Sequence, residues 1–183
     1  MKVTQQVILH LLILVIGVQK LNAQTQKGLD IDGEVAGDSS GYSVSMTNSN
    51  TIAIGAVQND GNGSDAGHVR IYSWNGLAWM QKGTDIDGEV SGDRSGRSLS
   101  MPDSNTVAIG AINNDGNGTE AGHVRIYSWN GSTWAQKGID IDGEAASDQS
   151  GYSVSMPDSN IVAIGANTNS GNGAVSGHVR IYS

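Results

Sequence analysis

The amino-acid sequence predicts an all-β fold made of three copies of one unit, and three observations support this prediction. Short segments recur almost unchanged at a spacing of 55 residues, as Gly-His-Val-Arg-Ile-Tyr-Ser does at 67–73, 122–128 and 177–183. Within each copy, apolar and polar residues alternate with a period of two, and no helical period is present after residue 23. Apolarity is also highest in the second apolar run of each copy and falls toward the fourth.

Each unit contains the pattern of four short strands. In the first unit, residues 42–46 alternate large apolar with small polar side chains, as a half-buried strand does. Residues 51–56 are apolar or small on both faces, which predicts a strand that is buried on both sides. Residues 68–74 predict a third strand, and the Asn-Gly pair after it predicts a hairpin into a fourth strand that carries Trp79 and Gln81.

A gradient of burial from inner to outer strands is typical of a β-propeller blade, whose outer strand meets solvent. The small residues Ser43, Ser45, Ala53 and Gly55 would let adjacent blades approach closely. We therefore expect a β-propeller-type repeat of three ~55-residue four-stranded units, either a partial propeller or one that an oligomer completes. Because known propellers have roughly four to eight blades, a β-trefoil-like threefold closure is the alternative.

Residues 1–23 have the pattern of a signal peptide: a positive charge at Lys2, a short apolar run over 7–18, and the small residue Ala23 at the cleavage point. The apolar run is short for a membrane span, and an uncleaved anchor is the alternative. We expect residues 24–183 to form a single repeat domain that is secreted or at the cell surface, with no membrane insertion after cleavage. Its units are expected at about 29–83, 84–138 and 139–183, with an N-terminal strand over 24–28 that completes the last unit.

Composition excludes several classes of function. The chain has no cysteine, so it contains neither disulfides nor a thiolate metal site. Its formal net charge of −8 argues against a surface that follows nucleic-acid phosphates. Every acidic residue recurs by repetition, and no Ser-His-Asp or paired-carboxylate arrangement stands out. We therefore expect that the protein is not an enzyme and has no catalytic residues.

Sixteen of the 18 acidic residues fall in the linkers between units or in the loops between the second and third strands. These two kinds of connection share one edge of an antiparallel blade, whereas Asp103 and Asp158 fall in the opposite turns. The linker acids occupy relative positions 1, 3, 5 and 9, and alternate carboxylates can ligate Ca²⁺, the one cofactor that the sequence suggests. A solvated acidic linker is the alternative. The candidate metal ligands are Asp30, Asp32, Glu34, Asp38, Asp85, Asp87, Glu89, Asp93, Asp140, Asp142, Glu144 and Asp148.

The loops between the second and third strands hold a second set of candidates, with side chains suited to hydrogen bonding with a polar ligand. His68, His123 and His178, one in each repeat, are expected to be structural, with a zinc site as the alternative if a compact closure brings them together. The tryptophans that flank the outer hairpin are expected to pair across strands, with an aromatic platform for sugars as the alternative. The candidate ligand-binding residues are Asp60, Asn62, Asp65, Asp115, Asn117 and Glu120.

The repeat resembles the FG-GAP repeat of integrin α-chain propellers over essentially all of residues 24–183. Ser-Gly-Tyr-Ser-Val-Ser at 40–45 stands where the family has its FG segment, and Ala-Ile-Gly-Ala at 53–56 stands where it has GAP, with Val57 in place of the proline. The likeness is to the degenerate form found in exported bacterial and algal proteins. It implies a propeller, extracellular display, an adhesive or binding role, and no catalytic residues. The family's calcium loop is not carried over, because the segment 101–105 is too short to wrap a cation.

The sequence therefore predicts an exported, non-enzymatic repeat module for binding, adhesion or surface display that uses its acidic loop face. The expected partner is an extracellular protein or a glycan, and a homodimer is expected if two chains share one ring. The alternatives are a carbohydrate-binding, lectin-like module and a truncated fragment of a longer propeller array without independent function.

Overall fold

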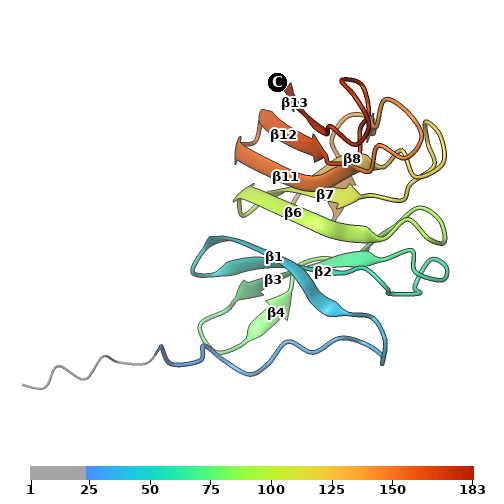
Figure 1. The fold of residues 1–183 in the computed structure, drawn as a ribbon. Coiled ribbons are helices and arrows are strands. Elements are labelled where there is room, and N and C mark those ends of the chain that lie inside the picture. The colour runs from blue at the N-terminus through green and yellow to red at the C-terminus, as the bar shows by residue number, and fades with distance from the viewer. Residues whose placement is uncertain (1–23) are drawn as a thin grey trace, which may run out of the picture.

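A computed structural model describes residues 24–183, so the signal peptide predicted over 1–23 lies outside the described residues. The described chain consists of strands, turns and loops, arranged as three antiparallel sheets (Figure 1). This confirms the predicted all-β class. No helix within 24–183 has the length and apolarity that crossing a membrane requires.

The three sheets repeat the same strands along the chain. The first sheet consists of β1 (Ser40–Asn48), β2 (Thr51–Ala56), β3 (His68–Trp74), β4 (Trp79–Gln81) and β5 (Ile86–Asp87). The second consists of β6 (Ser95–Asp103), β7 (Thr106–Ala111), β8 (His123–Trp129), β9 (Trp134–Gln136) and β10 (Ile141–Asp142). The third consists of β11 (Ser150–Asp158), β12 (Ile161–Ala166) and β13 (His178–Tyr182).

The predicted fourth strand of the unit is present but divided into two pieces. β4 pairs with the end of β3, where Trp79 lies opposite Trp74, and β5 pairs with the beginning of β3, where Ile86 lies opposite Val69. The same division recurs in the second sheet, where β9 and β10 both pair with β8. The chain that leaves the fourth strand therefore stays on its own sheet until it reaches the first residue of the third strand.

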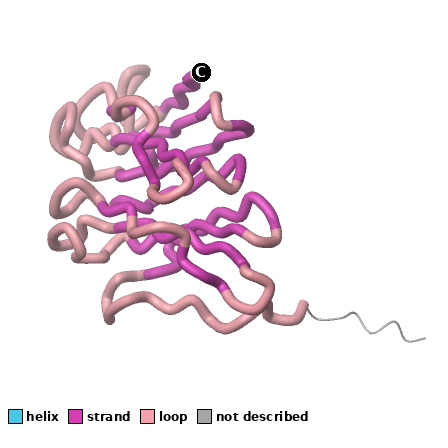
Figure 2. Tube along the Cα trace, turned by 180° about the vertical axis from the view of Figure 1, so that it is seen from behind, coloured by secondary structure: helices cyan, strands magenta, loops and turns pink. Residues whose placement is uncertain are grey.

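The sheets lie face to face in a row, with the second between the first and the third (Figure 1 and Figure 2). β6 packs against β1 and β2, and β11 packs against β6 and β7. Neighbouring propeller blades have this arrangement. The β-trefoil-like alternative is wrong, because its repeats would surround a common threefold axis instead of following one another in a row.

The core consists of the apolar side chains between neighbouring sheets. Val69 and Ile71 of β3 share one buried cluster with Met101 of β6, and Val124 of β8 shares a second cluster with Met156 of β11. All residues of β7 are buried, as the sequence predicts for a strand that is covered on both faces. Burial of this kind, which contributes about 25 cal/mol for each Å² of apolar surface, holds the row of sheets together.

Small residues set the distance between the sheets. A Cβ atom on Gly55 would overlap the carbonyl oxygen of Gly96 in the next sheet, and one on Gly110 would overlap that of Gly151. The hydroxyl of Ser43 donates to the same Gly96 carbonyl at 2.5 Å. The predicted close approach of blades at Ser43 and Gly55 is therefore present, and main-chain atoms take part in it directly.

The N-terminal segment does not have the structure that the sequence predicts. Residues 24–28 form no strand, and they lie against the first unit instead of completing the last one. The ammonium group of Lys27 donates to the side-chain oxygen of Asn50 at 2.7 Å, and the carbonyl of Lys27 accepts a 2.8 Å hydrogen bond from the indole of Trp79. Gly28, with φ of +82°, passes so close to Trp74 that a Cβ atom would lie 2.7 Å from its ring. These contacts tie the segment to the outer hairpin of the first unit and to the turn between β1 and β2.

We predict that Gly110→Ala will lower the free energy of unfolding by about 1–3 kcal/mol, since the added methyl group would push the second and third sheets apart. Urea denaturation of the two proteins measures this difference. Gly165→Ala is the matched control, because a Cβ atom there meets the Ser153 side chain of its own sheet, as one on Gly110 meets Ser98, but no neighbouring sheet. Equal losses in the two variants would contradict the spacing role of Gly110.

Candidate functional site

The long connections of all three units lie on one side of the stack, where Figure 2 shows a row of large loops. The pairing explains this, because the start of β1, the end of β2 and the start of β3 meet at the same edge of the sheet. We call this side the acidic edge. It comprises the loops 57–67, 112–122 and 167–177 and the linkers 29–39, 84–94 and 139–149, which together hold 16 of the 18 acidic residues.

The lysines lie at the other edge. The ammonium groups of Lys27, Lys82 and Lys137 donate to main-chain or side-chain oxygens of the turns between the first and second strands. These are all the lysines in the described part of the chain. Acidic and lysine side chains are therefore separated across the width of the sheets.

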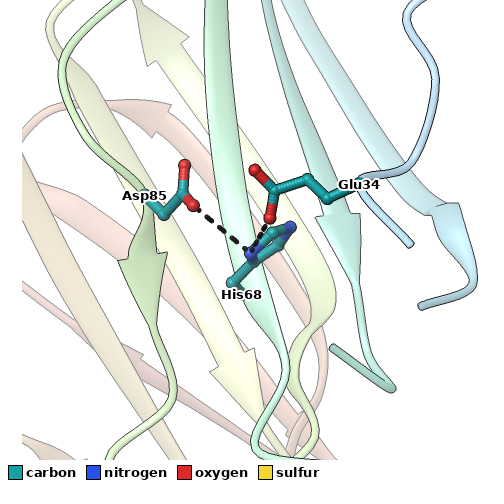
Figure 3. A group of neighbouring side chains, drawn as sticks. All are labelled: Glu34, His68 and Asp85. Atoms are coloured by element: carbon teal, nitrogen blue, oxygen red, sulfur yellow. Dashed lines mark ion pairs between the residues drawn. The ribbon is translucent and has the colours of Figure 1, made fainter. Parts of the chain in front are cut away.

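One acid from each of two successive linkers meets a histidine, as Figure 3 shows for Glu34, His68 and Asp85. We call these three residues the first cluster. Nδ1 of His68 lies 3.9 Å from Oε2 of Glu34 and 3.8 Å from Oδ2 of Asp85. Glu34 belongs to the linker before the first sheet, whereas Asp85 immediately precedes β5. The pairing of β5 with β3 brings Asp85 to the histidine, because Asp87 lies opposite His68.

The second sheet contains the same arrangement, in the second cluster of Glu89, His123 and Asp140. Nδ1 of His123 lies 3.8 Å from Oε2 of Glu89 and 3.8 Å from Oδ2 of Asp140. In the third unit, His178 lies 3.6 Å from Glu144, and no further carboxylate joins them within the described residues.

The histidine side chains of the two clusters are buried without hydrogen bonds. His68 and His123 are at most 1% exposed, and neither ring nitrogen of either residue has a hydrogen-bond partner among the described residues. Burial lowers the pKa of His123 below its ordinary value, and the neighbouring Arg125 cation lowers it further. The His123 imidazole is therefore neutral at pH 7, and one of its nitrogens carries a free lone pair.

The third linker position has a different role. The carbonyl oxygen of Asp32 accepts a 2.7 Å hydrogen bond from the guanidinium of Arg70, and the carbonyl of Asp87 accepts one of 2.8 Å from Arg125. Arg180 donates to the carbonyl of Asp142 in the same way. In these bonds the main chain of the aspartate, and not its carboxylate, holds the linker on the sheet.

The ninth linker position is structural. Asp38, Asp93 and Asp148 are at most 3% exposed, and each carboxylate accepts hydrogen bonds from main-chain amides of its own linker. Each also accepts one from an asparagine side chain in the loop that follows the second strand, at Asn59, Asn114 and Asn169. These aspartates therefore fold the linker and join it to the neighbouring loop.

The four acids of one linker thus face different partners and do not surround a common point. The described residues do not form the loop-type calcium site that the linker spacing suggests. The acid at position 9 accepts hydrogen bonds from its own linker, and the acids at positions 1 and 5 point to different histidines. Cation binding by the linker acids stays a prediction. The structure instead brings together one acid from each of two linkers and a histidine.

The candidate ligand-binding loops are held mainly by their own polar side chains. Asp60 accepts a 2.8 Å hydrogen bond from the amide of Asp65, and Asn62 donates to the carbonyls of Gly88 and Glu89 at 2.8 and 2.9 Å. Asp115, Asn117 and Glu120 repeat these bonds in the second unit. Ligand binding by these loops stays a prediction, and their asparagines join each loop to the next linker.

The tryptophans form the predicted cross-strand pairs. The rings of Trp74 and Trp79 are 5.4 Å apart at an interplanar angle of 65°, and the ammonium group of Lys27 lies 4.9 Å from the centre of Trp74. Lys82 covers the pair of Trp129 and Trp134 in the same way. Because a lysine and the glycine after it already occupy each pair, an open platform for sugar rings is not present there.

We predict that Asp93→Ala will lower the free energy of unfolding by about 1–3 kcal/mol, since two main-chain amides and the Asn114 side chain would lose their acceptor. Thermal or urea denaturation checks this value. Asp87→Ala makes the same charge change at an exposed side chain of the same linker, and should cost less than about 0.5 kcal/mol. If Asp87→Ala lowered the free energy of unfolding as much as Asp93→Ala, the buried Asp93 carboxylate would not be the group that holds the linker.

Comparison with known families gives one match. The family model of the FG-GAP repeat matches residues 23–72, which contain β1, β2 and most of β3. No curated protein matches the chain. The matched segment recurs twice more at a spacing of 55 residues and forms the same strands in the second and third sheets. The match identifies an FG-GAP repeat in residues 23–72, and the internal repetition and the stacked antiparallel sheets support an FG-GAP repeat protein with β-propeller-like units.

Proposed function

We propose that this protein is an exported, non-enzymatic module for binding or adhesion, and that the acidic edge is its contact surface. The observation that carries the proposal is the concentration of 16 acidic residues along one edge, where four arginines offset only part of their charge, while the three lysines of the described chain are bound to the turns at the other edge. FG-GAP repeats are commonly found in adhesion-related proteins, which supports the same role.

A surface with a large excess of negative charge attracts partners that carry positive charge. Carboxylates that are concentrated on one edge create a local field that steers basic protein surfaces into contact and repels nucleic acids and anionic lipids. Asp60, Asp115 and Glu120 are exposed at the tips of the loops, where a partner would meet them first. The partner that fits this surface is therefore an extracellular protein with a basic patch, with an extracellular glycan as the alternative.

We predict that the double variant Asp60→Asn, Asp115→Asn will bind basic extracellular proteins severalfold more weakly, chiefly through a slower association rate. The measurement is binding to a panel of immobilised basic extracellular proteins at about 0.15 M salt, where the screening length is about 8 Å. Each asparagine keeps the side-chain oxygen that now accepts a hydrogen bond from the amide of Asp65 or Glu120.

Asp103→Asn, Asp158→Asn is the matched control for that experiment. It removes the same charge from the opposite edge, where each carboxylate also accepts one main-chain hydrogen bond, from Asn105 or Asn160. Equal weakening in the two double variants would contradict the proposal. Retention on a glycan array that neither variant changes would favour the lectin-like alternative.

We also propose that two copies of the chain associate through the outermost faces of the stack. Ile181 of β13 is 71% exposed, although its equivalent Ile71 is 1% exposed against the second sheet. Met46 of β1 is 52% exposed, although its equivalent Met101 is 6% exposed against the first sheet. The third sheet therefore offers the apolar face that the following sheet covers in the existing interfaces, and the first sheet of a second copy provides the face that would cover it.

We predict a dimer or larger species by light scattering, and at least tenfold weaker association for Met46→Glu. Met80→Glu is the matched control, because Met80 is equally exposed, at 54%, but lies on the outer strand β4. A monomer at every concentration, or equal effects of the two substitutions, would overturn this assembly.

A further inference from the structure

We propose that the first and second clusters are each a binding site for one divalent transition-metal ion, for which Zn²⁺ is the best-suited common ion. Each site would be formed by one imidazole nitrogen and two carboxylate oxygens, from Glu34, His68 and Asp85 or from Glu89, His123 and Asp140. This inference is independent of the proposed contact surface for a protein partner. It concerns a composite site that no single linker contains.

The spacing of the three atoms suits an ion between them. In the first cluster the two distances from Nδ1 of His68 to a carboxylate oxygen are 3.8 and 3.9 Å, which is too long for a hydrogen bond. Zinc bonds of about 2.0–2.2 Å at tetrahedral angles separate neighbouring ligand atoms by roughly 3.4 Å. Each carboxylate oxygen would therefore need to approach Nδ1 by roughly 0.4–0.5 Å to share one ion with it, and the two oxygens lie within 4.8 Å of each other.

The buried histidine is the second, independent observation. The side chain of His68 is 1% exposed, and its nitrogens have no hydrogen-bond partner in the described chain, although Nδ1 faces both carboxylates. A polar atom that is buried without a partner destabilises the fold, and a metal ion at this point would give Nδ1 a partner. His123 repeats both features in the second cluster.

Each carboxylate is already oriented by a partner on its other oxygen. In the first cluster, Oδ1 of Asp85 accepts a 2.6 Å hydrogen bond from Gln81, and Oδ2 faces the histidine. Oε1 of Glu34 lies 3.8 Å from the guanidinium of Arg70, and Oε2 faces the histidine. Outer partners of this kind hold ligands in place in known metal sites.

The second cluster has the same outer partners. Gln136 donates to Oδ1 of Asp140 at 2.6 Å, and Arg125 lies 3.4 Å from Oε1 of Glu89. Oε2 of Glu89 also accepts a 3.3 Å hydrogen bond from Asn114. The repetition of ligands, distances and outer partners makes the two sites equivalent.

The choice of metal follows from the donor set. Calcium and magnesium prefer sites made entirely of oxygen atoms, whereas an imidazole nitrogen favours zinc and its neighbours among the transition metals. The third unit provides an internal reference, because His178 faces Glu144 alone and is 23% exposed. We therefore expect two zinc ions per chain.

The test is isothermal titration of the metal-stripped protein with zinc sulfate, with circular dichroism to confirm that each variant is folded. The expected result is two ions per chain for the parent protein. His123→Asn should reduce this number to one, and His178→Asn, the same substitution in the third unit, should leave it at two. Co²⁺ in place of Zn²⁺ gives a separate readout, because Co²⁺ in a low-symmetry site absorbs visible light. The intensity of this absorption band should halve in His123→Asn.

Asp85→Asn provides a second variant that keeps the shape of the side chain and the bond from Gln81, and it should weaken binding at the first site at least tenfold. The proposal is overturned if zinc does not bind the parent protein more tightly than about 100 μM, if calcium binds and zinc does not, or if His123→Asn and His178→Asn have the same effect. The last result would indicate diffuse binding along the acidic edge.

Discussion

Close approach between neighbouring sheets is the constraint on which the rest of this structure depends. Gly55 and Gly110 lie against main-chain carbonyls of the following sheet, and serine hydroxyls of β1 and β6 donate to the same carbonyls. Because these contacts involve main-chain atoms, the distance between the sheets does not depend on the packing of large side chains. The apolar layers on either side, which contain Met101 and Met156, can then pack at the density of a protein interior.

The distance between neighbouring sheets also determines the path of each linker from one sheet to the next. A linker begins beside the third strand of one sheet and ends at the first strand of the next, where a parallel bridge joins Gly67 to Ser95. Its first acid, as at Asp85, therefore faces the histidine of its own sheet, and its glutamate, as at Glu89, faces the histidine of the next. A repeat of nearly identical copies thus creates groups of side chains that no single copy contains.

The acidic residues divide into those that build the edge and those that are available to a ligand. Buried aspartates such as Asp93 accept main-chain amides and give each linker a fixed shape. The carboxylates that remain exposed are consequently held on a rigid frame, and fewer conformations are lost when a partner binds them. The lysines, such as Lys82, are held at the opposite turns, and the arginines at this edge, such as Arg125, offset only part of the negative charge. The proposed contact surface depends on this combination of rigidity and excess negative charge.

Local patterns in the sequence were sufficient to predict the three units and the strands of each unit. They also predicted the small residues between blades and the edge that carries the acids. Each of these features depends on residues that are close together in the chain. The cross-strand tryptophan pairs followed in the same way from one hairpin. Only the tertiary structure decided that the sheets form a row, that Lys27 and Gly28 attach to the first unit, and that each buried histidine meets acids from two linkers. His68 lies 17 residues from Asp85 and 34 from Glu34, so their meeting depends on the distance between sheets and on the return of β5 to β3. The period of two in a strand carries no information about the distance between sheets or about the return of the chain to an earlier strand.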